Sequence, residues 1–232
     1  MEDAIFVMQK DKCRFIIFLI LFFLFTGIMG LFFWSFISDL QKPEYQEAFS
    51  AWVADLGIKG VVVLFGFQIL QIVVAVIPEG PVQIIAGAAY GVWGGLLIII
   101  AGCIIATLLV FSLVRKFGLP LVKRFIGTDA INTWGFLASR KKTALITFVL
   151  FLIPGIPKDT LTYLVPLSRL SIVQFTLISV IARFPAILSS TAMGDAAMQG
   201  NRVLFIVIFG ITGLAGILGI QFKERVIQRF RL

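Results

Sequence analysis

Charged side chains stand inside stretches of this chain that otherwise carry none, and their chemistry needs an explanation. They are Glu79, Lys158, Asp159 and Arg183. A charge at the centre of a membrane helix costs about 3 kcal/mol or more unless it is paired or hydrated, so such residues are candidates for a functional site. The alternative is an internal ion-pair network, such as Arg183 with Glu79 or Asp159, and both explanations can hold together.

The four candidates differ in what they can bind. The guanidinium of Arg183 is permanently charged and presents a fork of donors that suits two phosphate oxygens. We expect Lys158, and the backbone of Gly80 at the start of a half-length helix, to bind the same anion. Glu79 and Asp159 can take up and release protons, and we assign them to proton coupling.

The composition places the chain in a membrane. It is 59% hydrophobic and 14% charged, with a mean hydropathy of +1.04, far from the balance of soluble domains. The formal net charge of +8 comes from short basic clusters beside apolar runs, which indicates membrane topology and anionic headgroups rather than nucleic acid. The chain has no His, which excludes His-based acid–base catalysis and His metal sites. We expect an all-α integral membrane protein with no catalytic residue, no metal site and no cofactor.

Several uncharged runs are long enough to cross a bilayer. A helix rises 1.5 Å per residue, so about 20 residues span the hydrocarbon core. We expect four full transmembrane helices, at residues 15–37, 94–114, 171–192 and 203–222.

Two other apolar segments are interrupted by proline, so that each arm covers only about half a membrane. They contain "IPEGP" (77–81) and "IPGIP" (153–157), which share Ile-Pro-x-x-Pro. Unwound backbone survives at membrane depth only where protein or trapped water satisfies it, so we expect re-entrant helical hairpins at 60–92 and 143–168. The expected hairpin tips are Pro78, Pro81, Pro154, Gly155 and Pro157.

The distribution of Lys and Arg predicts the orientation. If 60–92 enters and leaves on one side, both termini are cytoplasmic, with fifteen Lys and Arg inside and three outside. A full crossing at 60–77 would instead put the seven basic residues of 115–142 outside. The two hairpins then enter from opposite faces. A hairpin followed by a span, repeated with inverted orientation, is typical of transporters whose substrate site lies near the midplane.

Three parts of the chain follow from this topology. Residues 1–49 hold a cytoplasmic tail, the first anchor and an external loop, residues 50–222 form the membrane domain, and residues 223–232 form a basic cytoplasmic tail. Between the helix at 94–114 and the second hairpin, apolar residues recur at helical spacing in 119–140, with basic residues at both ends. We expect this segment to be an amphipathic helix in the cytoplasmic interface.

Three stretches carry a family resemblance. They are "IPEGPVQIIAGAAYGVWGG" (77–95), "FLIPGIPKDTLTYLVP" (151–166) and "ARFPAILSSTAMGDA" (182–196). Together they resemble the VTT-domain superfamily of DedA and SNARE-associated Golgi proteins, and the Pro-Gly-x-Pro-Lys-Asp form resembles its bacterial Tvp/TMEM-type branch most closely. The resemblance covers about residues 50–222 and implies opposed re-entrant hairpins, a bacterial plasma membrane and lipid translocation. By position, Glu79 matches the acidic residue of the first hairpin, Asp159 that of the second, and Arg183 the arginine that follows.

These observations predict a transporter of the flippase or scramblase type. Its substrate would be a phosphate-bearing lipid, either a phospholipid or a polyprenyl phosphate, and protons would supply any drive. A proton-coupled transporter of ions or small solutes and a non-transporting scaffold remain alternatives. An intramembrane aspartyl enzyme would need two opposed carboxylates, but the chain lacks a Gly-x-Gly-Asp segment. The expected partners are membrane lipids and no nucleic acid, and a homo-oligomer is compatible with these features.

Overall fold

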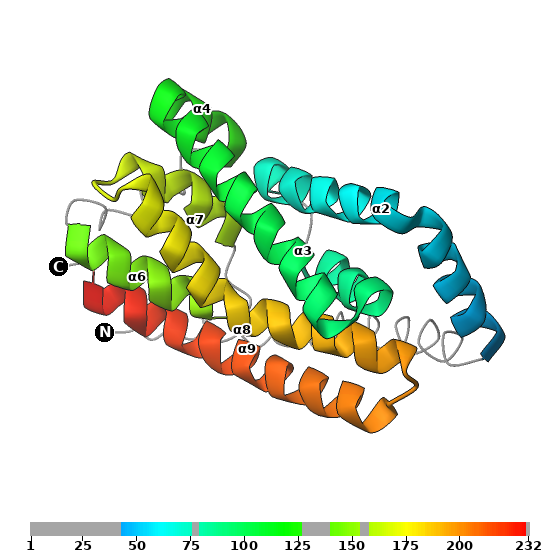
Figure 1. Cartoon of the computed structure of the whole chain (residues 1–232). Coiled ribbons are helices and arrows are strands. Elements are labelled where there is room, and N and C mark those ends of the chain that lie inside the picture. The colour runs from blue at the N-terminus through cyan, green and yellow to red at the C-terminus, as the bar shows by residue number, and fades with distance from the viewer. Residues whose placement is uncertain (1–42, 76–78, 127–139, 154–157, 231–232) are drawn as a thin grey trace. The chain divides into compact units, whose positions relative to one another are not determined.

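All regular elements in the described part of the chain are helices. The computed structural model describes residues 43–75, 79–126, 140–153 and 158–230 (Figure 1). Its elements are α2 (Pro43–Val74), α3 (Glu79–Phe117), α4 (Leu119–Ile126), α6 (Arg140–Leu152), α7 (Lys158–Leu164), the 3₁₀ helix η2 (Val165–Leu167), α8 (Ile172–Met198) and α9 (Arg202–Phe230). The expected all-α class is therefore confirmed. The expected anchor at 15–37 lies outside the described residues.

The chain divides into two compact units, Met1–Glu47 and Ala48–Leu232. Of the first unit, the structure describes only the beginning of α2. The second unit contains the remaining helices and every contact discussed below.

Two glycines divide the long helices α2 and α3. Gly57 has φ 47° and ψ −128°, and Gly91 has φ 70° and ψ 176°. A positive φ is strained for residues with a Cβ, so glycine is suited to both positions. The break at Gly57 leaves 58–74 as one continuous arm, roughly 25 Å long at 1.5 Å per residue. The break at Gly91 separates the arm 79–90 from the long helix 92–117.

Two contacts define how α2 runs relative to the two arms of α3. Gly60 of α2 lies beside the hydroxyl of Tyr90, and farther along α2 Gln68 lies against Gly102. Hence 58–74 and 92–117 run in the same direction. The arm 79–90 runs in the opposite direction, since it begins after the end of α2 and its Tyr90 lies beside Gly60.

Helix α8 packs along both arms of α3. Gly87 meets Thr191, and the Phe111 and Phe175 rings lie 6.0 Å apart, so α8 runs parallel to 79–90 and antiparallel to 92–117. Helix α9 lies along α8 on the side away from α2 (Figure 1). The buried core contains side chains of α3, α6, α7 and α8, among them Ile99, Leu150, Leu161 and Phe175.

Four helical stretches are long and apolar enough to cross a membrane. They are Glu47–Val74, Glu79–Phe117, Ile172–Met198 and Arg202–Gly219. Three of them contain or overlap the expected spans at 94–114, 171–192 and 203–222. The stretch Glu47–Val74 overlaps the expected hairpin at 60–92. Length and composition do not orient a helix in a bilayer, so the re-entrant hairpins and the inverted repeat stay predictions.

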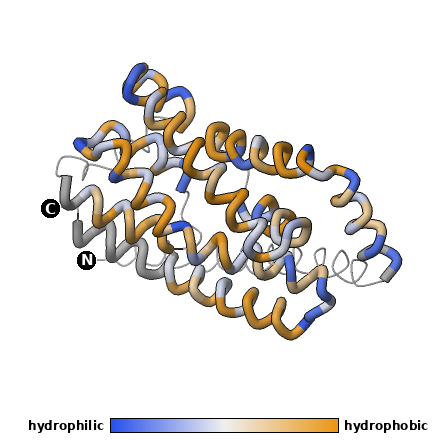
Figure 2. Tube along the Cα trace, in the orientation of Figure 1, coloured by the Kyte–Doolittle hydropathy of each residue, from blue (hydrophilic) through white to orange (hydrophobic). Residues whose placement is uncertain are grey.

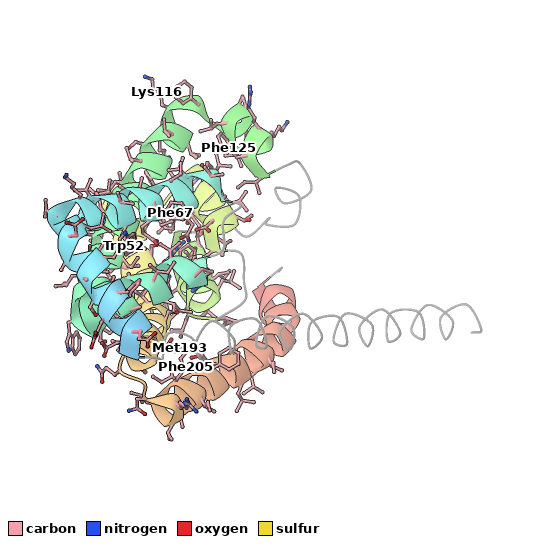
Figure 3. All side chains as sticks on the ribbon, turned by 90° about the vertical axis from the view of Figure 1, so that its right-hand side faces the viewer. Trp52, Phe67, Lys116, Phe125, Met193 and Phe205 are labelled. Atoms are coloured by element: carbon pink, nitrogen blue, oxygen red, sulfur yellow. The ribbon has the colours of Figure 1, made fainter. Side chains whose placement is uncertain are left out.

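The outer surfaces of these helices are apolar. Figure 2 shows hydrophobic residues over most of α2, α3, α8 and α9, with hydrophilic residues gathered toward helix ends. Large apolar side chains are exposed on all four helices, including Trp52 and Phe67, which are labelled in Figure 3. Exposed apolar area on this scale exceeds the patches found on soluble monomers and fits contact with lipid.

The expected amphipathic segment at 119–140 is described only in part. Helix α4 covers residues 119–126, buries Val122, and exposes Lys123 and Arg124. Residues 127–139 lie outside the described part. Phe125 stacks on Tyr163 with ring centroids 5.4 Å apart, so α4 packs on α7.

Candidate functional site

Glu79 is the first residue of α3, where a negative charge is favoured by the helix dipole. Its Oε1 accepts a hydrogen bond from Arg183 Nη1 at 3.0 Å, and its Oε2 accepts one from Gln83 Nε2 at 3.2 Å. Gln83 lies one turn farther along the same helix, so α3 itself supplies the second partner. The side chain of Glu79 is 17% exposed.

Asp159 occupies an equivalent place after the second proline break. It is the second residue of α7, and its Oδ1 accepts a hydrogen bond from Arg183 Nη2 at 3.2 Å. Its side chain is 13% exposed, so both carboxylates are more accessible than the arginine between them. Each break is therefore followed at once by an acidic residue that binds the same guanidinium.

Arg183 lies near the middle of α8 and is fully buried. Besides its two ion pairs, its Nη2 donates to Thr162 Oγ1 at 3.2 Å, while the Thr162 hydroxyl donates to the Lys158 carbonyl at 3.0 Å. The guanidinium carbon lies 4.9 Å from the centre of the Phe151 ring, within cation–π range. The Arg183 guanidinium therefore contacts residues of three other helices: α3 and α7 through hydrogen bonds, and α6 through the Phe151 ring.

Lys158 is the first residue of α7 and is 7% exposed. It is adjacent in sequence to Asp159, but among the described residues it forms no ion pair of its own. With Lys158 and Arg183 protonated and both carboxylates ionised, the cluster has no net charge. We call Glu79, Lys158, Asp159 and Arg183 the ion cluster.

Of the remaining predicted site residues, two lie in the described part of the chain. Gly80 is half-buried in the first turn of α3, and a Cβ built on it would meet no atom within 4 Å. Pro81 follows it and is exposed. The other predicted tip residues, Pro78, Pro154, Gly155 and Pro157, lie outside the described residues.

Close backbone contact between α3 and α8 brings Glu79 to Arg183. A Cβ on Gly87 would overlap the carbonyl of Thr191, and a Cβ on Gly194 would overlap the carbonyl of Ile84. A Cβ on Gly95 would lie 2.7 Å from the backbone of Ala86, in the other arm of α3. Small residues at these positions let the helix axes approach, as in many membrane proteins.

Three further hydrogen bonds hold α7 and the segment that follows it in place. The Tyr163 hydroxyl donates to the Val73 carbonyl at the end of α2. Arg115 Nη2 donates to the carbonyls of Ser168 and Leu170, both at 2.9 Å, where the chain passes from η2 to α8. The segment that carries Asp159 is therefore fixed to both α2 and α3.

Sequence reasoning found the four charged residues and missed their uncharged partners. Gln83 and Thr162 each lie one turn beyond a predicted site residue, a spacing that places them on the same helix face. That spacing could have identified Gln83 and Thr162 from the sequence. Phe151 had none, because phenylalanine is abundant in this chain.

The ion cluster can exchange protons and bind anions. Protonation of either carboxylate would remove one counter-charge from Arg183 and free some of its donors. Each carboxylate binds the guanidinium of Arg183. In aspartyl enzymes, by contrast, two carboxylates share one proton. No group of three or more metal-ligating residues occurs in the described ranges.

Comparison with known protein families gives one match. The VTT domain matches residues 77–196, a range that contains the whole ion cluster and ends near the end of α8. No curated protein and no solved structure matches the chain.

Proposed function

The chain belongs to the VTT-domain family of multi-pass membrane proteins, and from this premise we propose that it moves a phosphate-bearing lipid between the leaflets of a bilayer. Members of this family are generally thought to be transporters and are generally not enzymes. The lipid would be a phospholipid or a polyprenyl phosphate. Its headgroup would pass the ion cluster while its tails stay in the hydrocarbon.

One observation carries the proposal: a fully buried arginine holds carboxylates from the two helices that follow the proline breaks. A phosphate group, like a carboxylate, offers a pair of anionic oxygens, and Arg binds both groups through paired donors. A lipid phosphate can therefore take the place of Glu79 or Asp159 on Arg183. Uptake of a proton by the displaced carboxylate would keep the cluster neutral.

Lys158 and Gly80 extend this binding role. Lys158 brings a second buried cation beside the same carboxylates. Gly80 leaves open space at the first turn of α3, next to Glu79. We assign both to headgroup binding, and Glu79 and Asp159 to proton coupling.

We further propose that the two proline breaks are tips of re-entrant hairpins that enter from opposite faces. The parallel course of 58–74 and 92–117 supports this for the first hairpin, because both begin at the level where Gly60 meets Tyr90. From the contact of Gln68 with Gly102, the end of the first arm lies beside about residue 108, before 92–117 ends. In this arrangement both termini are cytoplasmic, and the membrane is a bacterial plasma membrane.

A scaffold role is the second candidate, and the pairing of both Arg183 amino groups favours it. A buried ion pair can hold helices in register without binding any ligand. The two functions differ in what removal of the charges does. A scaffold tolerates neutral replacements that keep the fold, whereas a headgroup site does not.

The deciding experiment measures leaflet exchange of fluorescent phospholipids and of a polyprenyl phosphate in proteoliposomes. The parent protein is compared with Arg183→Gln, with Glu79→Gln and with the double variant, each at mildly acidic and mildly alkaline pH. We expect faster exchange at acidic pH in the parent, since a protonated carboxyl releases Arg183. Arg183→Gln should abolish exchange, and Glu79→Gln should weaken its dependence on pH.

Arg169→Gln serves as the matched control, because Arg169 is exposed and lies outside the ion cluster. It should leave exchange unchanged. Retained exchange in the folded double variant would exclude a headgroup role for the cluster and favour the scaffold. Absence of exchange for every lipid in the folded parent would exclude lipid transport and favour a solute transporter or scaffold.

A further inference from the structure

A second polar cluster lies beside the ion cluster and belongs to no role described so far. Its members are uncharged and come from three different helices: Gln68, Gln71, Thr107 and Ser179. Gln68, Gln71 and Ser179 have no exposed surface, and Thr107 is 1% exposed. We call these four residues the polar layer.

Helix register places these side chains at one level. Phe111 meets Phe175 where α3 and α8 run antiparallel. Thr107 precedes Phe111 by one turn and Ser179 follows Phe175 by one turn, so Thr107 and Ser179 face the same region.

The register of α2 against 92–117 places Gln68 and Gln71 near this level. The amide nitrogen of Gln68 donates to Cys103 Sγ at 3.3 Å, and Cys103 lies one turn before Thr107. Gln71 lies about one turn beyond Gln68 on a helix that runs parallel to 92–117. The same shift along both helices brings Gln71 to the level of Thr107.

Arg183 borders the polar layer directly. It follows Ser179 by one turn, and side chains on a helix lean toward its N-terminus, so the base of the Arg183 side chain lies over Ser179. Its amino groups bind the carboxylates and Thr162, but its Nε has no hydrogen-bond partner among the described residues.

The polar layer is left with unpaired polar atoms. Within the described ranges, both amide atoms of Gln71, the Gln68 carbonyl oxygen and the Thr107 and Ser179 hydroxyls lack partners. A buried polar atom without a partner costs about 1–3 kcal/mol, and native proteins almost always satisfy such atoms with protein or ordered water. Five or more at one level therefore need a common explanation.

The mixture of donors and acceptors identifies the ligand class. Arg183 Nε and the Gln71 amide nitrogen only donate, the two amide oxygens only accept, and the hydroxyls do both. An anion would require donors and a cation would require acceptors. Water both donates and accepts, and buried waters commonly make about three hydrogen bonds to such groups.

We propose that the polar layer binds a small cluster of ordered water molecules that completes the hydrogen bonding of Arg183. Phe111 and Phe175, with ring centroids 6.0 Å apart, close the layer on the side away from Arg183, one turn from Thr107 and Ser179. These waters lie next to the Arg183 guanidinium. The aromatic side chains separate them from the Arg115 end of α3. This site requires only the fold, so it can be tested without transport.

Thermal unfolding of the detergent-solubilised full chain tests the water site through the sign of the shift. Thr107→Val and Ser179→Ala remove a hydroxyl with little change of shape. If these hydroxyls bind water, each variant lowers Tm, by about 2–4 °C for a loss typical of one hydrogen bond in a chain of this size. The double variant then loses less than the two shifts added, because both act on one cluster.

Thr191→Val is the matched control, since the Thr191 hydroxyl is equally buried but donates within its own helix to Ile187 and Leu188 carbonyls at 3.1 Å. It should leave Tm nearly unchanged. A Tm equal to or above that of the parent for both Thr107→Val and Ser179→Ala would overturn the water site, because replacing unsatisfied hydroxyls with apolar groups stabilises.

A density map in which ordered water is visible gives an independent test on the parent protein. We expect density within about 2.7–3.2 Å of the Gln71 amide and of the Thr107 and Ser179 hydroxyls. Side chains that bond directly to one another, with no density between them, would refute the proposal. This result does not depend on whether any variant folds.

Discussion

At the scale of single residues, the ion cluster rests on one side chain that serves two helices. Arg183 has no exposed surface, and its two amino groups reach Glu79 and Asp159 at 3.0 and 3.2 Å. Taking these charges out of water is costly, and their mutual attraction offsets much of that cost only while all partners remain. Each member of the cluster therefore depends on the others for its charge state.

Removal of Arg183 should make this dependence measurable. Arg183→Gln leaves two partly buried carboxylates beside Lys158 alone, and we expect the free energy of unfolding in detergent to fall by about 3–5 kcal/mol. Arg183→Gln combined with Glu79→Gln should be more stable than Arg183→Gln, because one uncompensated carboxylate is gone. A double variant that is no more stable would contradict charge pairing as the cause. The exposed control Arg169→Gln should change stability by less than about 0.5 kcal/mol.

Charged residues could be found from sequence, whereas the polar residues around them could not. Glu79, Asp159 and Arg183 interrupt long uncharged runs, and an ionised group in such a run requires a partner. Gln68 and Gln71 interrupt a similar run, but an amide costs less to bury and can pair with many groups. Their importance follows only from the register of α2 against α3.

At the scale of elements, the contact between α3 and α8 positions Glu79 against Arg183. The helices approach so closely at Gly87 and Gly194 that neither position has room for a Cβ. The contact lies two to three turns from the ion pair and along the same two helices. A change in helix spacing there is transmitted to the carboxylate because helices are stiff over this length.

Substitution of these glycines should separate the helices. Gly87→Ala and Gly194→Ala each place a methyl group against a backbone carbonyl that cannot rotate away, and we expect a loss of about 1–3 kcal/mol or more in stability. Thermal unfolding measures this loss. Gly210→Ala and Gly213→Ala are matched controls on α9, where a Cβ meets nothing within 4 Å. Because Gly→Ala raises helix propensity, these controls should lose no stability, and an equal rise at all four glycines would show that propensity outweighs close packing.

The extent of the elements was predictable where hydropathy alone determines it. The apolar runs 94–114 and 203–222 became parts of α3 and α9 because about 20 uncharged residues suffice for a spanning helix. Helix α2 begins at Pro43, inside a segment expected to be an external loop. Hydropathy alone did not predict this part of the helix because it carries charged residues. Pro suits the first position of a helix because its missing N–H would be unpaired there anyway.

At the scale of the whole molecule, the orientation of the membrane domain depends on the side from which 58–74 enters the bilayer. Because 58–74 and 92–117 run in the same direction, entry of 58–74 from outside makes the basic end of 92–117 and the exposed Lys123 and Arg124 of α4 face the cytoplasm. If 58–74 enters from inside, the same residues face outward. The positive charges favour the first orientation.

Accessibility of single cysteines separates the two orientations. In bacterial cells expressing the chain with both native cysteines replaced by Ala, a membrane-impermeant maleimide should label Lys59→Cys in intact cells. It should label Arg124→Cys only after permeabilisation, because a re-entrant first hairpin keeps α4 inside. Both residues are exposed, so access to the reagent depends on the side of the membrane. Labelling of Arg124→Cys in intact cells, with Lys59→Cys protected, would mean that the membrane domain has the opposite orientation. Labelling of both would contradict the parallel course of 58–74 and 92–117.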